Sequence, residues 1–365
     1  MTEKKRKIAY DISILETESL TGVEKMCLNL FLELWKRSPE WEHTVFCRHH
    51  HERFNEFPSE VKIKATGGGR FWRYRELPKA LAKENYELFI SPVSALPWPC
   101  SIPMMAFIHE CQWRHVTNEQ KSFMQRFLVK AAIRRAKIIL TISQFSRKEI
   151  LEECGKRQPE IEIIYPSRAL EKNNVSSEQS IEEIKNHFGI EDKYCLFVSS
   201  IRPKKNIDLL IETFKRPEMR NFALVLAGKV IDNSFPEKAR EAGCSNVHFL
   251  GYTSDGIVQT LYENAECFIF ASLNEGFGIP ILEAFSYDCP VIASACASIP
   301  EVAGDAAIYL EEMTPEELSR QILRLSGDDA LRTMLIERGR ERVNEFSWKK
   351  SAEKLKDIIH RKILK

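Results

Sequence analysis

The sequence predicts an α/β protein with two doubly wound domains, each built on a parallel sheet. Short apolar runs alternate with amphipathic stretches along nearly the whole chain, which is the order of repeated β–α units. A length of 365 residues is enough for two hydrophobic cores. Hydrophobic periodicity vanishes in a polar stretch from residue 166 to 180, which predicts an interdomain linker. We expect a first domain at 1–168, the linker and the start of the second domain at 169–190, the second domain at 191–345, and a helix at 346–365 that packs back toward the first domain.

The composition excludes several classes of protein. The 53 basic and 52 acidic side chains give no overall attraction to nucleic acid or to a membrane. The 10 cysteines are scattered, without a C-x-x-C pair, which favours reduced core cysteines over a disulfide framework or a zinc site. No run resembles a signal peptide or reaches transmembrane length. We therefore expect a cytoplasmic enzyme.

The first domain opens with a predicted strand at 8–13, followed by Thr21-Gly22-Val23 and an apolar-periodic helix. The loop between them lies at the carboxyl edge of the sheet, where doubly wound folds bind ligands, although Gly22 is also compatible with a plain loop glycine. Further strands are expected at 44–47 and 61–63, with helical residues at 71–83. Three consecutive histidines, 49–51, stand in a polar stretch and indicate a solvated loop more than a metal site.

The rest of the first domain adds a second candidate ligand group. Strands are predicted at 88–91 and 104–108, with the motif Pro97-Trp98-Pro99 between them, and the second strand ends at His109. This histidine faces the same edge as Gly22, where it can orient a hydroxyl or take part in proton transfer; a purely structural histidine is the alternative. Beyond it come predicted strands at 138–142 and 161–165, and Ser146 with Glu149 predicts a capping box for the helix between them.

A basic amphipathic helix is predicted at 123–137, between the predicted strands at 104–108 and 138–142. Its arginines and lysines lie beside apolar residues such as Phe127 and Ile133. Such a helix can rest on an anionic membrane surface, and a solvated helix face is the alternative.

The second domain repeats the alternation. Strands are expected at 194–199, 222–227, 247–250, 267–271 and 290–293, with helices between them. A final helix at 348–363 carries an apolar stripe that must be buried.

Two turns of this second domain carry charge at strand ends. The first contains Arg202, Lys204 and Lys205 beside a helix start, and three cations there suit a diphosphate. In the second, Glu275 lies in a glycine-containing turn and Glu283 follows eight residues later, inside the next helix. Position 281 is isoleucine, so the three-glycine dinucleotide fingerprint is missing. Taken singly, each turn is equally compatible with an ordinary exposed turn.

Seven stretches together resemble the family 4 retaining glycosyltransferases, which have the GT-B fold of two Rossmann-like domains facing each other across a cleft. The stretches occur in the family's order and span nearly the whole chain. They are Thr21-Gly22-Val23, Ile108-His109-Glu110, 141–147, 203–206, Gly251-Tyr252, 275–280 with Glu283, and 299–307.

The resemblance implies roles for individual residues. Glu275 matches the glutamate that contacts the donor sugar, Glu283 the one that binds the nucleotide ribose, and Lys205 the lysine that neutralises the donor diphosphate. His109 matches a histidine near the transferred sugar, and Gly22 a glycine near the diphosphate and the acceptor. The remaining donor-binding positions implied are Phe277, Gly278 and Ile279, through their backbone, and Ser200.

The chain departs from the family pattern at three places. Ser200 stands where the family commonly has an arginine, and Arg202 resembles a variant arrangement of that catalytic cation. Glu110 follows the histidine where aspartate is usual. Asp288 stands where a glycine is common.

From this resemblance we expect a retaining transferase that moves a hexose from a GDP- or UDP-sugar to a glycan or lipid-linked acceptor in bacterial surface polysaccharide synthesis. The signatures look most like those of mannosyl- and rhamnosyltransferases. We expect no metal, since no Asp-x-Asp pair stands at a strand end, and no further cofactor or nucleic acid. The alternatives are a non-catalytic nucleotide-sugar or glycan binding module, and a nicotinamide-dependent oxidoreductase, which the missing glycine fingerprint disfavours.

Overall fold

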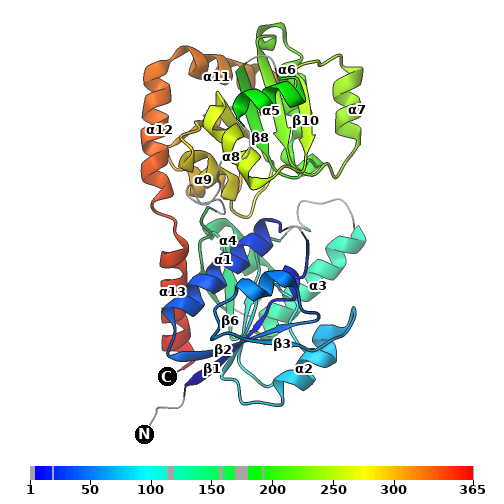
Figure 1. Ribbon diagram of the computed structural model, residues 1–365, viewed down its shortest axis with the longest axis vertical. Coiled ribbons are helices and arrows are strands. Elements are labelled where there is room, and N and C mark those ends of the chain that lie inside the picture. Colours follow the sequence, from blue (N-terminus) through cyan, green and yellow to red (C-terminus); the bar gives the residue numbers. More distant parts are fainter. Residues whose placement is uncertain are drawn as a thin grey trace. The chain divides into compact units, whose positions relative to one another are not determined.

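The computed structural model describes residues 5–364 except 19, 112, 114–118, 156–158, 169–179 and 191–192. The chain divides into two compact units (Figure 1). The first unit contains Met1–Pro166 and Ser347–Lys365, and the second contains Ser167–Phe346. Residues 169–179 of the expected linker lie outside the described residues.

The first unit is a parallel sheet with helices packed on it. Its described strands are β1 (Arg6–Asp11), β2 (Trp41–Cys47), β3 (Lys62–Ala65), β4 (Leu88–Ser91), β5 (Met104–Phe107), β6 (Ile138–Thr141) and β7 (Glu160–Ile163). Its α-helices are α1 (Gly22–Arg37), α2 (Glu76–Leu81), α3 (Glu119–Arg135), α4 (Gln144–Glu153) and α13 (Trp348–Lys362). The short 3-10 helices are η1 (Ser13–Leu15), η2 (Glu52–Glu56) and η3 (Trp72–Tyr74).

The strands of this unit run in the order β3-β2-β1-β4-β5-β6-β7. The direction of winding therefore reverses between β1 and β4, and the crevice outside their carboxyl ends is where doubly wound sheets bind ligands. β4, β5 and β6 are buried along their whole length, which explains why they appear in the sequence as continuous apolar runs.

The last helix of the chain, α13, completes the first unit. Its residues Ala352, Leu355 and Ile359 are fully buried, and the helix packs against α1. The Lys356 ammonium donates a hydrogen bond to the carbonyl of Arg37 at the end of α1, at 2.6 Å. The apolar stripe seen in the sequence is thus buried within this unit, although 180 residues separate it from the preceding part.

The second unit has the same architecture. Its described strands are β8 (Lys193–Val198), β9 (Phe222–Ala227), β10 (Val247–Gly251), β11 (Cys267–Phe270), β12 (Val291–Ser294) and β13 (Ala307–Leu310). Its α-helices are α5 (Ile181–Phe188), α6 (Ile207–Phe214), α7 (Ser234–Glu241), α8 (Asp255–Asn264), α9 (Ile279–Ser286), α10 (Ile299–Ala303), α11 (Pro315–Gly327) and α12 (Asp329–Val343). The 3-10 helices are η5 (Pro203–Lys205) and η6 (Pro217–Met219). The strand order β10-β9-β8-β11-β12-β13 places the reversal between β8 and β11.

The predicted fold class is confirmed, because both units are doubly wound parallel sheets of α/β type. Three local expectations were wrong. β13 was not foreseen, and the helical stretch 71–83 is divided into η3 and α2. The cap of α4 is Ser143, whose hydroxyl accepts from the Ser146 amide, while the Glu149 carboxylate accepts from the amide of Cys111. Over the described residues, no helix combines the length and the apolar character that crossing a membrane requires.

Candidate functional site

The loops that follow β8 and β11 meet at the point where the second sheet reverses its winding. Since the two strands are parallel neighbours, their carboxyl ends lie at one edge of the sheet. The Leu273 amide, after β11, donates to the carbonyl of Lys204, after β8, at 3.0 Å. Two turns that are 70 residues apart in the sequence therefore form one surface.

A buried ion pair joins these two turns. Lys205 Nζ lies 2.5 Å from Glu275 Oε1, and the two residues are only 6% and 9% exposed. Burial raises the pKa of the Glu275 carboxyl, but the charges of Lys205 and Lys204 and the hydrogen bond from Lys205 outweigh it, so the pKa is lowered overall. Glu275 is therefore ionised at neutral pH. The ammonium also lies 5.3 Å from the centre of the Phe270 ring, which excludes water from this side.

The turn that carries Glu275 is fixed from behind. The Ser298 hydroxyl lies 2.8 Å from the carbonyl oxygen of Glu275 and 2.9 Å from that of Phe277. Gly278 has φ of +117°, a conformation that side chains disfavour, and a methyl group there would stand 3.2 Å from Ile281 Cδ1. The turn then enters α9, where Pro280 has no N–H and the Ile281 amide donates to the Gly278 carbonyl at 3.0 Å. The amides of the turn before Pro280 are therefore the ones placed to meet an anionic or hydroxyl ligand.

The turn after β8 is equally well defined. Arg202 Nε donates to the Ser200 hydroxyl at 2.9 Å, so the two residues that depart from the family pattern are in contact. Asn206, at φ of +57°, reverses the chain between η5 and α6. Gly228, after the neighbouring β9, has no room for a side chain, because its Cβ would lie 2.1 Å from the carbonyl oxygen of Ser199.

Glu283 occupies the second turn of α9 and is 7% exposed. Burial, and then the charge of Glu283, raise the pKa of Tyr287 to about 12 and raise that of Tyr262 well above its ordinary value. The two phenol rings stack at 5.9 Å. The predicted donor residues of the second domain thus lie on two connected turns and the helix that follows one of them.

His109 lies in the first unit, directly beyond β5. Its Nε2 is 2.8 Å from the carbonyl oxygen of Pro92, so this nitrogen carries the proton and donates, and Nδ1 keeps its lone pair. Nδ1 is buried and has no hydrogen-bond partner among the described residues. Burial lowers the pKa of the ring, which keeps the imidazole neutral at pH 7. The site therefore presents one unused acceptor, suited to a hydroxyl group.

Gly22 is the first residue of α1, next to Thr21, whose side chain forms a capping box with Glu24. The charge of Glu24, two residues after Gly22, is close enough to His109 to act against the lowering of its pKa. Gly22 and His109 therefore both belong to the carboxyl edge of the first sheet. The space around Gly22 is open, with no atom within 4 Å of the position a methyl group would take.

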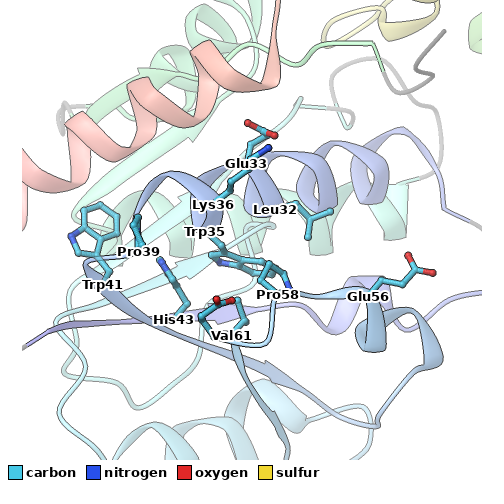
Figure 2. Close-up of a pocket in the computed structure, with 11 residues that line it drawn as sticks. Leu32, Glu33, Trp35, Lys36, Pro39, Trp41, His43, Glu56, Pro58 and Val61 are labelled. Carbon is cyan, nitrogen blue, oxygen red and sulfur yellow. The ribbon is translucent and has the colours of Figure 1, made fainter. Parts of the chain in front are cut away.

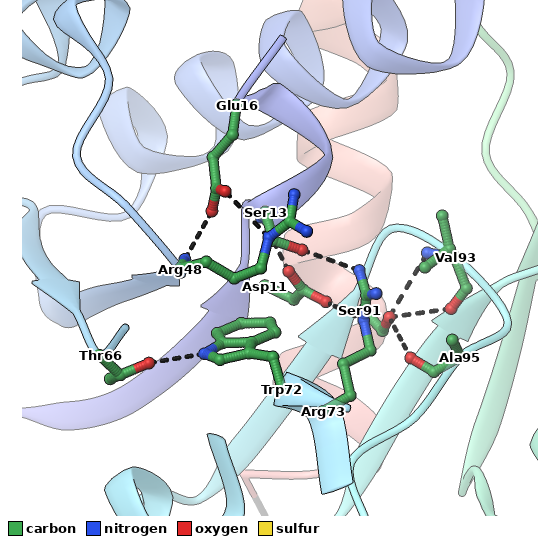
Figure 3. Close-up of polar contacts among 10 residues, drawn as sticks. All are labelled: Asp11, Ser13, Glu16, Arg48, Thr66, Trp72, Arg73, Ser91, Val93 and Ala95. Carbon is green, nitrogen blue, oxygen red and sulfur yellow. Dashed lines mark hydrogen bonds and ion pairs between the residues drawn. The ribbon is translucent and has the colours of Figure 1, made fainter. Parts of the chain in front are cut away.

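A polar cluster at the end of β1 was not anticipated from the sequence. Figure 3 shows the fully buried Asp11 carboxylate bound by Arg73, with Nε to Oδ2 at 2.7 Å, and by the Ser13 amide at 2.8 Å. A second Arg73 nitrogen donates to the Ser13 hydroxyl at 2.8 Å. The signal for this cluster in the sequence is a single aspartate, Asp11, at the end of an apolar run. Its position at the end of the predicted strand does not indicate what binds it.

A cavity of about 440 Å³ lies elsewhere in the first unit (Figure 2). It is lined by the end of α1, the start of β2 and the segment before β3, and contains none of the predicted site residues. Across the described parts of the chain, no group of three or more histidine, cysteine or acidic side chains is arranged to hold a metal ion.

Two family models match successive parts of the chain. The model described as Glycosyltransferase Family 4 matches residues 20–172, and the model described as Glycosyl transferases group 1 matches residues 180–342. Together they include every predicted site residue.

Similar proteins include O-antigen chain mannosyltransferase B of Escherichia coli, 31% identical over 58% of this chain and 58% of the relative. A serotype-specific mannosyltransferase, WbdA, also of Escherichia coli, is 27% identical over 74% of this chain and 34% of its own length. The chain thus spans about a third to somewhat more than half of these relatives. A solved structure from Anabaena, Alr3699/HepE in complex with UDP-glucose, has a TM-score of 0.75 at 15% identity and covers 97% of this chain and 99% of that one. At this identity the likeness concerns the fold.

Proposed function

Because the chain belongs to the family 4 glycosyltransferases, we propose that it transfers a mannosyl residue from a nucleotide-sugar donor to a glycan acceptor. The observation that carries the proposal is the buried Lys205–Glu275 pair at the winding reversal of the second sheet. The mannosyltransferase relatives favour mannose as the sugar and the assembly of a bacterial surface polysaccharide as the setting. GDP-mannose is the first donor to test, and UDP-sugars are the second class.

The main task of such a site is to stabilise the departing diphosphate. The Lys205 ammonium donates to Glu275, and its positive charge at this edge of the sheet would attract the phosphate oxygens of the donor. Arg202 and the first-turn N–H groups of α6 and α9 would add positive potential at the same edge. These groups support leaving-group departure by protein charges alone, and we propose that no metal ion is required.

The remaining residues would position the sugar and the nucleotide. Glu275 would accept a hydrogen bond from a sugar hydroxyl, and the backbone of Phe277, Gly278 and Ile279 would donate to others. Glu283 would bind the ribose. In the first unit, His109 would accept a hydrogen bond from a ligand hydroxyl through its Nδ1.

We propose that the reaction retains the anomeric configuration. The acceptor hydroxyl would attack on the face from which the diphosphate leaves, and a phosphate oxygen would take its proton. No carboxylate is then needed as a base on the opposite face of the sugar.

An additional proposal concerns α3 and anionic membranes. Its second half packs Val129, Ala132 and Ile133 into the core, whereas Phe123 and Phe127 of its first half are 73% and 58% exposed. Aromatic side chains next to cations suit the headgroup region of a bilayer. A variant with both phenylalanines changed to alanine should lose binding to vesicles rich in anionic lipid; unchanged binding would leave α3 as a solvated helix.

The test of the proposed function is transfer from GDP-mannose to α-linked mannotriose, followed by NMR of the product. A new α-linkage formed in the presence of EDTA would support a retaining, metal-independent mannosyltransferase. A β-linkage would contradict retention, and a strict need for a divalent cation would contradict metal independence. Tight binding of a nucleoside diphosphate without turnover on any saccharide would favour the non-catalytic binding module.

A further inference from the structure

The segment that leads from β1 to Gly22 is held by three arginines from outside it. Arg73 binds its first residues, as described above. Arg48, directly after β2, donates through Nε to the Glu16 carboxylate at 2.9 Å, and that side chain is only 6% exposed (Figure 3). The third arginine, Arg53 in η2, holds the part of the segment that lies nearest to Gly22 in the sequence.

Arg53 binds the backbone of this segment at three places. Its Nη1 donates to the carbonyl of Leu15 at 2.7 Å and to that of Thr17 at 3.0 Å, and its Nη2 donates to the carbonyl of Glu18 at 3.2 Å. A guanidinium is planar and its donors are fixed relative to one another. One side chain therefore fixes the course of the main chain between η1 and α1, where the residues belong to no strand or helix.

Arg53 is itself held in place by η2. The His51 Nδ1 accepts from the Arg53 amide at 3.2 Å, and the His51 carbonyl accepts from the Phe54 amide at 2.9 Å. Phe54 is 1% exposed, so η2 is anchored in the core of the first unit. The last of the three consecutive histidines thus caps the turn that carries Arg53.

We propose that Arg53 is a positioning residue for the transfer reaction, which it serves by setting the path of the backbone that enters α1 at Gly22. The inference rests on the proposed function, in which the backbone at Gly22 approaches the diphosphate and the acceptor. α1 is anchored separately, because Leu30 and Leu34 are fully buried. Removal of the guanidinium should therefore displace the segment before Gly22 without unfolding the helix.

The experiment compares variants that differ in what they leave at this position. Arg53→Met removes the hydrogen bonds, and Arg53→Lys keeps the charge without the planar fork. Arg332→Met is the matched control, because Arg332 donates to the carbonyls of Ala265 and Glu266, which precede β11 at the opposite edge of the second sheet. Each protein is measured for initial rates with GDP-mannose and mannotriose, for GDP affinity by calorimetry, and for hydrogen exchange of the peptide covering residues 13–24.

Arg53→Met should lower kcat/KM about tenfold or more, because a small displacement of a group near the reacting atoms is costly. Its GDP affinity should stay unchanged, since the proposed donor site lies in the second unit, and exchange of residues 13–24 should become faster. Arg53→Lys should recover only part of the activity. His51→Ala, which removes the cap and leaves the guanidinium, should give a smaller loss in the same direction, and Arg332→Met should keep the wild-type kcat/KM.

Three results would overturn the inference. They are a wild-type kcat/KM in Arg53→Met, a full recovery in Arg53→Lys, which would assign the effect to charge alone, and an equal loss in Arg332→Met, which would assign it to general stability. If the wild-type protein neither binds GDP nor transfers mannose, the proposed function fails. Unchanged exchange of residues 13–24 in Arg53→Met would instead show that Arg53 does not hold the segment, whatever the donor.

Discussion

At the scale of the residue, the buried Lys205–Glu275 pair should contribute to stability as well as to the proposed chemistry. Lys205→Met leaves a buried carboxylate without its cation, which should lower the free energy of unfolding by about 3–5 kcal/mol at pH 7. Adding Glu275→Gln removes the unpaired charge and should recover much of that loss. Guanidinium unfolding of the two variants beside the wild type measures both effects.

The stability of the wild type and that of Lys205→Met should depend on pH with opposite signs. In the wild type the pKa of Glu275 is lowered from 4.5, so its contribution is present above pH 4.5 and is lost as the pH falls through the lowered pKa. In Lys205→Met, burial without the cation raises that pKa, and stability should increase as the pH falls from 7 toward 5. A variant that loses stability with acid as the wild type does would contradict this description of the pair.

Gly22 allows structure and function to be separated at one position. Gly22→Ala meets no atom within 4 Å and sits in a helix, so stability should stay the same or rise by up to about 1 kcal/mol. If the donor or acceptor approaches the backbone there, kcat/KM should fall at least tenfold, about 1.4 kcal/mol, because the methyl group occupies ligand space. Full activity in a stable Gly22→Ala protein would make it an ordinary helix-start glycine.

The sequence indicated the charged residues predicted to bind the nucleotide-sugar donor, but not the groups whose hydrogen bonds fix the surrounding structure. Lys205 and Glu275 stand out because charge follows an apolar run at a strand end. The partners of Asp11 and Ser298 could not be found in the sequence, because they are distant along the chain: Arg73 is 62 residues from Asp11, and the two carbonyls that Ser298 binds are 23 and 21 residues from it. Single polar residues with such partners leave no periodic signal.

At the scale of the element, the turn between α9 and β12 explains one departure from the family pattern. Asp288 adopts φ of +59°, the left-handed region where glycine is common, and its carboxylate makes two hydrogen bonds to Arg340 at 2.7 and 2.8 Å. The ion pair with Arg340 thus offsets the strain of placing an aspartate in a conformation that glycine adopts more easily.

Substitutions of Asp288 should separate the effect of the left-handed backbone from that of the ion pair. Asp288→Gly relieves the left-handed conformation but loses an exposed ion pair, so the stability should change by less than about 1 kcal/mol. Asp288→Val loses the ion pair and also places a β-branched side chain in the left-handed conformation, so it should destabilise the protein by about 1–3 kcal/mol. Thermal unfolding compares the two, and equal losses would mean that the ion pair, not the backbone, dominates.

Strands such as β4 and β9 were the easiest elements to predict, because they are buried on both faces and appear as apolar runs. β13 was not predicted because its run of only four residues, Ala307–Leu310, is short and begins close behind the helix α10. The first half of α3 was predicted as amphipathic, yet its phenylalanines face solvent. Periodicity does not tell whether an apolar helix face has a partner.

At the scale of the whole molecule, the alternation of strands and helices gave the fold class, but the strand order had to come from the structure. In each unit the winding reverses beside the first strand, and the candidate residues lie at the carboxyl edge: the predicted donor residues in the second unit, and His109 and Gly22 in the first. Local patterns carry no information on which strands become neighbours, so Asp11 and its partners could be found only in three dimensions.

The most direct test of the central claim, a nucleotide-sugar site in the second unit, is thermal melting of the full chain against GDP, UDP, TDP, ADP and NAD, with and without magnesium. A ligand at 100 times its Kd should stabilise the protein by about 2.7 kcal/mol, a shift of roughly 5–10 °C for units of this size. We predict a magnesium-independent shift with one nucleoside diphosphate, largest for GDP, that Glu283→Gln reduces. A shift with NAD alone, or with none of the nucleotides, would contradict it.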